Sequence, residues 1–202
     1  MTTRIGINGF GRIGRTYLRA ALAGGADVEV VAVNDLTDAG TLATLLEWDS
    51  VNGHFGGVAV EDDGLRVADR VIRVFSEPEP ARIPWGEVGA DVVIDATGFF
   101  TDREKAAEHL RGGARKVIVS APAKGDVPTF VLGVNDDRLD VSAADVFSNG
   151  SCTTNSLAPL AKVLNDVVGI ETGLMTTVHA YTGDQRLHED RKSTRLNSSH
   201  LR

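Results

Sequence analysis

The chain has 202 residues, a formal net charge of −7, a hydrophobic share of 42% and a single cysteine. The acidic balance argues against a general nucleic-acid-binding protein, and no apolar run approaches the length of a membrane span, so we expect neither partner. The N-terminus lacks the apolar core of a secretory signal, and one cysteine excludes an intrachain disulfide. These features predict a cytoplasmic protein whose cysteine is either an inert core residue or a nucleophile.

The first part of the chain alternates short apolar runs with two helical segments. The elements expected here are a strand over 4–8, a helix over 12–23, a strand over 28–33, a short helix over 41–47 and strands over 54–60, 65–68 and 71–75. In the first helix, Ile13, Leu18 and Leu22 are the candidate inner residues. The β-branched run Val28–Val33 is typical of a strand buried on both faces.

The α/β alternation resumes after a proline-rich stretch. The elements expected there are strands over 91–95, 116–120, 129–132, 145–147 and 173–180, and helices over 102–111 and 152–168. Strands that alternate with helices predict a mostly parallel sheet, and therefore an α/β fold. Residues 190–202 are basic, rich in serine and poor in large apolar residues, so we expect disorder in that tail.

The segment Gly9–Gly14 has the pattern G-x-G-x-x-G between a predicted strand and a predicted helix, and Asp35 ends the next strand. In a dinucleotide site, Gly9 permits the tight turn, Gly11 lets the backbone approach a pyrophosphate, and Gly14 lets the helix pack closely on the strand. Asp35 would accept hydrogen bonds from ribose hydroxyls and disfavour a 2′-phosphate, so NAD is favoured over NADP. The alternative is a glycine-rich turn that only packs, with Asp35 a solvated residue.

Cys152 directly opens the long helix expected over 152–168, and His179 lies in the last expected strand. The free N–H groups and the dipole at a helix N-terminus favour a thiolate, which is a competent nucleophile toward a carbonyl. His179 could then serve as the base or as the cationic partner. The alternatives are a small buried cysteine and a satisfied core histidine, and the sequence alone does not place the two side chains together.

Six segments, with their order and spacing, resemble the glyceraldehyde-3-phosphate dehydrogenase family. They are Ile7–Arg15, Val33–Asp35, Ala96–Gly98, Ser120–Pro122, Ser148–Asn155 and Val178–Thr182. The stretch Ser-Cys-Thr-Thr-Asn at 151–155 is highly specific, and the resemblance runs from about residue 3 to about residue 188. It implies a doubly wound (Rossmann) NAD-binding domain over 1–151, followed by the truncated start of an α+β catalytic domain over 152–189.

The resemblance implies an oxidoreductase of glycolysis that uses NAD and inorganic phosphate to convert glyceraldehyde 3-phosphate to 1,3-bisphosphoglycerate. Cys152 would attack the aldehyde, His179 would act as base, and phosphate would displace the resulting thioester. The cofactor-binding residues that it implies are Gly9, Gly11, Arg12, Ile13, Gly14, Asn34, Asp35, Thr97 and Ser120. The residues that it implies at the phosphate pockets are Ser151, Thr153 and Thr182. No metal is expected.

Two departures from the family pattern stand out. Residues 76–80 replace a stretch that often carries a basic residue near the adenine. The pattern is also lost after His188, so we expect a fragment whose tail over 190–202 is not native. Complete family members are homotetramers, a state that we do not transfer to the fragment. Two other functions stay open, namely an NAD-binding module without turnover and an erythrose-4-phosphate dehydrogenase.

Overall fold

The computed structural model describes residues 2–25, 27–62 and 64–178. The chain divides into two compact units, residues 1–169 and residues 170–202. All the described helices and strands belong to the first unit. The described part of the second unit, residues 170–178, forms neither helix nor strand.

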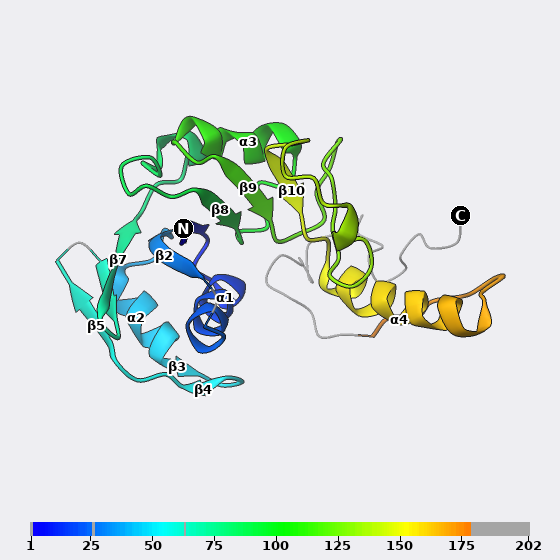
Figure 1. Cartoon of the computed structure of the whole chain (residues 1–202). Coiled ribbons are helices and arrows are strands. Elements are labelled where there is room, and N and C mark those ends of the chain that lie inside the picture. The colour runs from blue at the N-terminus through cyan, green and yellow to red at the C-terminus, as the bar shows by residue number, and fades with distance from the viewer. Residues whose placement is uncertain (1, 26, 63, 179–202) are drawn as a thin grey trace, which may run out of the picture. The chain divides into compact units, whose positions relative to one another are not determined.

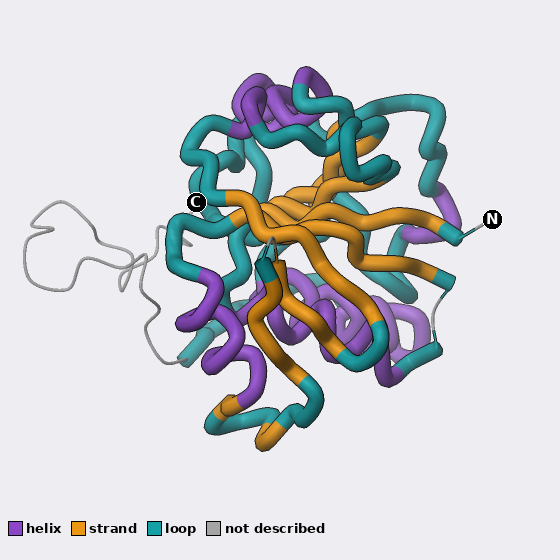
Figure 2. Tube along the Cα trace, turned by 90° about the vertical axis from the view of Figure 1, so that its left-hand side faces the viewer, coloured by secondary structure: helices purple, strands orange, loops and turns teal. Residues whose placement is uncertain are grey.

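An eight-stranded sheet forms the centre of the first unit, in the order β10-β9-β8-β1-β2-β7-β6-β5 (Figures 1 and 2). Its strands are β1 (Thr3–Asn8), β2 (Val28–Asn34), β5 (Val58–Glu61), β6 (Gly64–Val67), β7 (Arg70–Phe75), β8 (Val92–Asp95), β9 (Lys116–Val119) and β10 (Val146–Ser148). Neighbours from β10 to β7 are parallel, while β5 and β6 add an antiparallel edge. The winding reverses beside β1, so the predicted doubly wound α/β fold is confirmed.

Helices cover both faces of this sheet, with α1 (Arg12–Ala23) and α2 (Ala39–Glu47) on one face and α3 (Arg103–Arg111) on the other. The chain also forms helix α4 (Cys152–Val168), which has no buried residue, the 3-10 helices η1 (Pro80–Arg82) and η2 (Asp136–Arg138), and a separate hairpin of β3 (Trp48–Asp49) and β4 (Gly53–His54). Leu18 of α1 and Leu42 of α2 pack with Ile7 on one face, and Ala106 of α3 packs with Val117 on the other. Figure 2 shows the sheet between these two helical layers.

Two expectations for the N-terminal half need correction. Leu18 is buried, but Ile13 is 55% exposed and Leu22 is 38% exposed, so only one of the three predicted inner residues of α1 belongs to the core. Ile13 lies in the first turn of α1, directly after the carboxyl end of β1, where it is not covered by the sheet. The single strand expected over 54–60 is divided between β4 and β5, because Gly57 between them turns the backbone at φ +82°.

Two expected strands in the C-terminal half are also wrong. Residues 129–132 form only an isolated bridge, between Thr129 and Ser148. The Asn135 side chain accepts from the Val131 N–H and donates to the Thr129 carbonyl, and so satisfies backbone groups that a strand ladder would otherwise satisfy. Of the strand expected over 173–180, residues 173–178 form no strand, and residues 179–180 lie outside the described residues. A strand exists only where its backbone pairs with a neighbouring strand, and the described ranges provide no such pairing for 173–178.

Candidate cofactor and active site

The three glycines of the turn between β1 and α1 lie in three different environments. Gly9 has φ +86°, and a Cβ there would lie 2.8 Å from the Thr97 nitrogen. A Cβ on Gly14 would overlap the Gly9 carbonyl oxygen, so close packing of helix on turn excludes a side chain. A Cβ on Gly11 would meet no atom within 4 Å. The backbone at Gly11 is therefore open to an approaching ligand, while Gly9 and Gly14 are fixed by the fold itself.

The N-terminus of α1 has the character of an anion site. Its N-cap is Gly11, which offers no side chain to the free N–H groups of the first turn. By contrast, Asp38 caps α2 and Ser151 caps α4, each through a side-chain oxygen that accepts a backbone N–H at 2.9 Å. The uncapped N–H groups and the dipole of α1 fit a pyrophosphate, and the exposed side chains of Arg12 and Ile13 flank that position.

One hydrogen bond joins Asp35 to the glycine-rich turn, and a second joins it to the backbone two residues later. Its Oδ2 accepts from the Phe10 N–H at 2.8 Å, and its Oδ1 accepts from the Thr37 N–H at 3.0 Å. Each carboxylate oxygen has more than one lone pair, so the half-buried group keeps acceptors for the hydroxyls of a ribose. The fold thus places a fixed negative charge beside the open backbone of Gly11.

Asn34 lies one residue before Asp35 and is buried. Its Nδ2 donates to Asn8 Oδ1 at 2.8 Å and to the Glu77 carbonyl at 2.9 Å, and its Oδ1 accepts from the Glu77 N–H at 2.8 Å. Both N–H groups of this amide are therefore used within the protein, and a ligand can reach only a remaining Oδ1 lone pair. The same bonds fix the backbone of Glu77, in the stretch where the sequence departs from the family pattern.

Thr97 and Ser120 follow the carboxyl ends of β8 and β9, at the edge of the sheet that carries the glycine turn. The Thr97 hydroxyl donates to Asp95 Oδ1 at 2.7 Å, and the Ser120 N–H donates to the Asp95 carbonyl at 2.9 Å. Both residues are half-buried. The structure therefore brings these two residues to the same sheet edge as Gly9, as expected for parallel strands.

Cys152 is exposed at the first position of α4, immediately after β10 and a short connection. The Asn149 N–H donates to the Val119 carbonyl at 3.0 Å, and the Asn155 side chain donates to the Asn149 carbonyl at 2.7 Å. These two hydrogen bonds anchor the segment 149–155, which contains Cys152, to the carboxyl end of β9. Ser151 and Thr153 flank the thiol, but His179 and Thr182 lie outside the described residues, so the structure shows no geometry for the expected thiol–histidine pair.

A buried polar network was missed by the sequence reasoning. Asn8 Nδ2 donates to Asp95 Oδ2 at 2.8 Å, His109 Nε2 lies 3.0 Å from the same oxygen, and Trp85 Nε1 donates to His109 Nδ1 at 3.0 Å. All four residues are at most 2% exposed. The available signal was a polar residue that ends each of two apolar strands, β1 and β8, at the ligand edge of the sheet.

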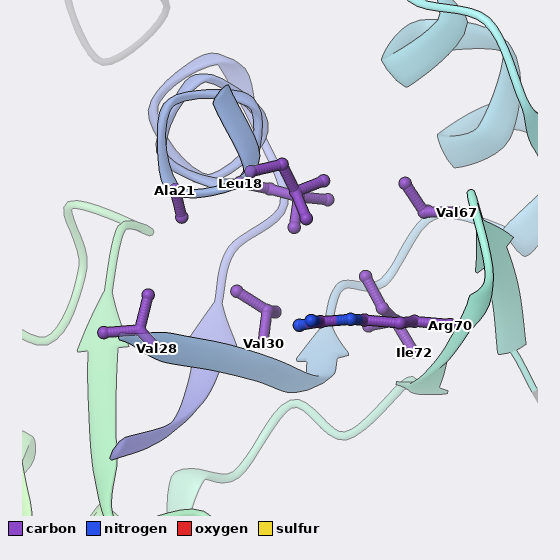
Figure 3. Close-up of a pocket in the computed structure, with 8 residues that line it drawn as sticks. Leu18, Ala21, Val28, Val30, Val67, Arg70 and Ile72 are labelled. Carbon is purple, nitrogen blue, oxygen red and sulfur yellow. The ribbon is translucent and has the colours of Figure 1, made fainter. Parts of the chain in front are cut away.

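The pocket in Figure 3 is a different feature, between α1 and strands β2, β6 and β7. Its cavity is about 10 Å³, room for roughly one water molecule. Leu18, Ala21 and Val30 line it, and Figure 3 shows the Arg70 side chain extending toward Val30. It is too small and too apolar to hold a dinucleotide.

Two further properties hold for the residues that the structure describes. No group of three or more His, Cys, Asp or Glu side chains is placed to hold a metal ion. None of the helices in the described ranges has the length and apolar character needed to cross a membrane.

A doubly wound sheet with an open glycine turn, an uncapped helix and an acid after the next strand defines a dinucleotide-binding domain. Residues 3–103 match the family model of the glyceraldehyde 3-phosphate dehydrogenase NAD binding domain, and residues 151–199 match the model of the C-terminal domain. The chain belongs to the glyceraldehyde-3-phosphate dehydrogenase family, which confirms the resemblance and NAD as the cofactor. The C-terminal domain match runs to residue 199, so the family resemblance extends beyond residue 188, where we expected it to end. That residues 190–202 are not native sequence stays a prediction.

Individual relatives agree with this assignment. Glyceraldehyde-3-phosphate dehydrogenase 1 of Streptomyces avermitilis is 56% identical over 94% of this chain and 57% of its own length. The glyceraldehyde-3-phosphate dehydrogenase of Streptomyces coelicolor and glyceraldehyde-3-phosphate dehydrogenase 1 of Bacillus subtilis are each 52% identical over 100% of this chain and 61% of their own length. The chain therefore spans about three fifths of the length of these curated relatives.

Proposed function

We propose that this chain is the cofactor-binding part of a phosphorylating, NAD-dependent glyceraldehyde-3-phosphate dehydrogenase and carries its nucleophile. One observation carries the proposal. The open glycine turn with Asp35 and the exposed Cys152 both follow the carboxyl ends of parallel strands in one mostly parallel sheet. A dinucleotide that extends along this edge from Asp35 brings its reactive end toward the side of the sheet where the thiol lies.

The residues at the sheet edge fit the parts of NAD. The first-turn N–H groups of α1 would bind the pyrophosphate beside Gly11, where no side chain blocks it. Asp35 would accept from the hydroxyls of the adenosine ribose, and its charge would repel the 2′-phosphate of NADP. Thr97 and Ser120 would line the groove across the ends of β8 and β9.

The proposed reaction proceeds through a covalent thioester on Cys152. The thiolate adds to the aldehyde carbon of glyceraldehyde 3-phosphate, and the resulting oxyanion takes up a proton to give a hemithioacetal. His179 removes that hydroxyl proton as the carbon loses a hydride. NAD, when bound, supplies the hydride acceptor. An oxygen of inorganic phosphate then attacks the thioester, and release of the Cys152 thiolate gives 1,3-bisphosphoglycerate.

The remaining assignments concern the complete protein. Ser151, Thr153 and Thr182 would contribute to the pockets for the substrate phosphate and inorganic phosphate. Residues 1–151 would form the cofactor domain, 152–189 the start of the catalytic domain, and 190–202 a tail that is not native. The complete enzyme would be a homotetramer, and its exposed nucleophilic thiol suits a reducing compartment such as the cytoplasm.

A second candidate function is an NAD-binding module without turnover, which is supported by the match of residues 3–103 to the NAD binding domain model. Calorimetric titration of NAD and the absorbance of NADH formed from glyceraldehyde 3-phosphate, NAD and phosphate separate the two functions in the full chain. Binding with NADH formation, absent in Cys152→Ser, supports the dehydrogenase. Binding without NADH formation supports the module, and absence of NAD binding overturns both.

A further inference from the structure

A row of buried polar side chains crosses the sheet directly beneath the cofactor edge. Asn34, Asn8 and Asp95 occupy the last paired positions of β2, β1 and β8, and the register places them opposite one another. Their side chains therefore project from the same face, and two hydrogen bonds of 2.8 Å join them into a chain. This face is the one on which α3 packs, because Val93 and Val117 share it.

The protonation of His109 follows from its neighbours. The indole N–H of Trp85 can only donate, so His109 Nδ1 must be an acceptor. The ring proton of a neutral imidazole then resides on Nε2, which donates to Asp95 Oδ2 at 3.0 Å. Asp95 Oδ2 thus receives one N–H from His109 and one from Asn8. This oxygen is fully occupied inside the protein and has no role left toward a ligand.

The indole that orients His109 is itself fixed by backbone on two sides. A Cβ on Gly6 would lie 2.6 Å from Trp85 Cε3, and a Cβ on Gly112 would lie 3.0 Å from Trp85 Cδ1. Only glycines allow the ring to fit between β1 and the end of α3, and the side chain is 0% exposed. Trp85 and His109 therefore form a rigid anchor for one oxygen of the Asp95 carboxylate.

The other oxygen of the same carboxylate reaches the cofactor edge. Asp95 Oδ1 accepts from the Thr97 N–H at 3.1 Å and from the Thr97 hydroxyl at 2.7 Å. The Thr97 Oγ1 in turn accepts from the Phe99 N–H at 3.1 Å. The hydroxyl proton is thereby committed to Asp95, so Thr97 can offer a ligand only a lone pair, which suits a hydroxyl or amide donor and not a phosphate oxygen.

We infer that Asp95, anchored by His109 and Trp85, is a positioning residue that fixes the Thr97 turn against the glycine turn of the NAD site. The two turns are in direct contact, since a Cβ on Gly9 would lie 2.8 Å from the Thr97 nitrogen. Asp95 does not reach the ligand surface, so it acts through Thr97. The inference rests on the proposed binding of NAD at this edge. It assigns to Asp95 a supporting role without direct contact to the cofactor.

The decisive variant is Asp95→Asn. All the neighbours of this carboxylate donate: His109 and Asn8 on one oxygen, and Thr97 on the other. An amide must turn its NH₂ toward one of the two sides, so it sets a donor against a donor and releases either the anchor or the Thr97 turn. The dissociation constant of NAD should rise about tenfold, the scale of one charge-assisted hydrogen bond.

The experiment is a double-mutant cycle of Asp95→Asn and Thr97→Val, read by calorimetric titration of NAD into the full chain below its unfolding transition. If Asp95 acts through Thr97, the losses of NAD affinity in the double variant are clearly less than additive, and Thr97→Ser, which keeps the hydroxyl, binds within about twofold of wild type. Leu65→Ala, a destabilising change in β6, serves as the control for general loss of stability and should retain NAD affinity.

Several results would overturn the inference. These are unchanged NAD affinity in Asp95→Asn, fully additive losses in the cycle, or an equal loss in Leu65→Ala. If Asp95→Asn does not fold, the two Thr97 variants still decide, because equal affinities for Thr97→Val and Thr97→Ser contradict the positioning role. Absence of NAD binding in the wild-type chain is a separate result, which would contradict the proposed function itself.

Discussion

Helices α1 and α4 both follow a parallel strand of the sheet and both begin at a candidate site residue, yet they are supported very differently. α1 buries Gly14 and Leu18 against the sheet and leaves its N-terminus uncapped. α4 is capped by Ser151 but has no buried residue, and its apolar side chains are exposed among the described residues. The comparison teaches that the half with the glycine turn is held by its own core, whereas Cys152 is held mainly by the hydrogen bonds of the segment that precedes and begins α4.

The largest expected effect concerns the nucleophile. Cys152→Ser should lower aldehyde-dependent NADH formation by about a thousandfold or more, because a hydroxyl is a far weaker nucleophile than a thiolate. NAD affinity should stay within about twofold, since the cofactor turn and the cysteine are supported separately. NADH absorbance and calorimetry measure the two quantities, and a parallel loss of NAD binding would show that the two regions are not independent.

The second prediction compares the cores of the two helices directly. Leu18→Ala removes a side chain that is 1% exposed and should lower the free energy of unfolding by about 3 kcal/mol. Leu160→Ala removes one that is 57% exposed in α4 and should cost about 0.5 kcal/mol or less. Urea unfolding followed by circular dichroism measures both. Equal costs would mean that α4 is packed as firmly as α1.

The glycine turn offers a matched pair with opposite readouts. A side chain at Gly14 overlaps the Gly9 carbonyl, so Gly14→Ala should destabilise the fold by about 2 kcal/mol. Gly11 has negative φ and open space around it, so Gly11→Ala should leave stability nearly unchanged while it weakens NAD binding. Thermal unfolding and NAD titration test the pair. Wild-type NAD affinity in Gly11→Ala would contradict the proposed position of the pyrophosphate beside Gly11.

The smallest expected effect is the acid dependence of the α2 cap. Hydrogen bonds from the Thr41 backbone and side chain lower the pKa of Asp38 below its ordinary value. A lowered folded-state pKa means that the stabilisation is complete above the unfolded-state pKa and is lost as the pH falls through the folded-state pKa. Asp38→Ala should therefore reduce the melting temperature slightly at neutral pH and less in acid. An unchanged difference across that pH range would contradict the assignment.

Local periodicity and glycine punctuation were enough to predict most of the fold. The bounds of α1 and α4 agree with the expected helices, because glycine ends one and a serine cap begins the other. Where side chains compete with the backbone, prediction failed. In the strand expected over 129–132, the Asn135 side-chain amide bonds backbone groups that a neighbouring strand would otherwise bond. A hydrophobic pattern gives no sign of such a side-chain-to-backbone hydrogen bond.

The candidate site was predictable only where its residues belong to short, contiguous sequence motifs. The glycines, Asp35 and Cys152 belong to compact motifs, and the structure gives each a clear position. The support beneath them joins Asn8, Asp95 and His109, whose positions are up to 101 residues apart along the chain. Such a network depends on strand register and on the packing of α3, which the sequence does not state.

NAD selectivity tests most directly the central claim that this chain holds a complete dinucleotide site with Asp35 as its ribose acceptor. The measurement is calorimetric titration of NAD and of NADP into the wild-type chain and into Asp35→Ser. The account predicts a clear preference for NAD in the wild-type chain, reduced by about tenfold or more in the variant as the 2′-phosphate ceases to be repelled. Equal affinity for the two dinucleotides in the wild-type chain, or no binding of either, would contradict it.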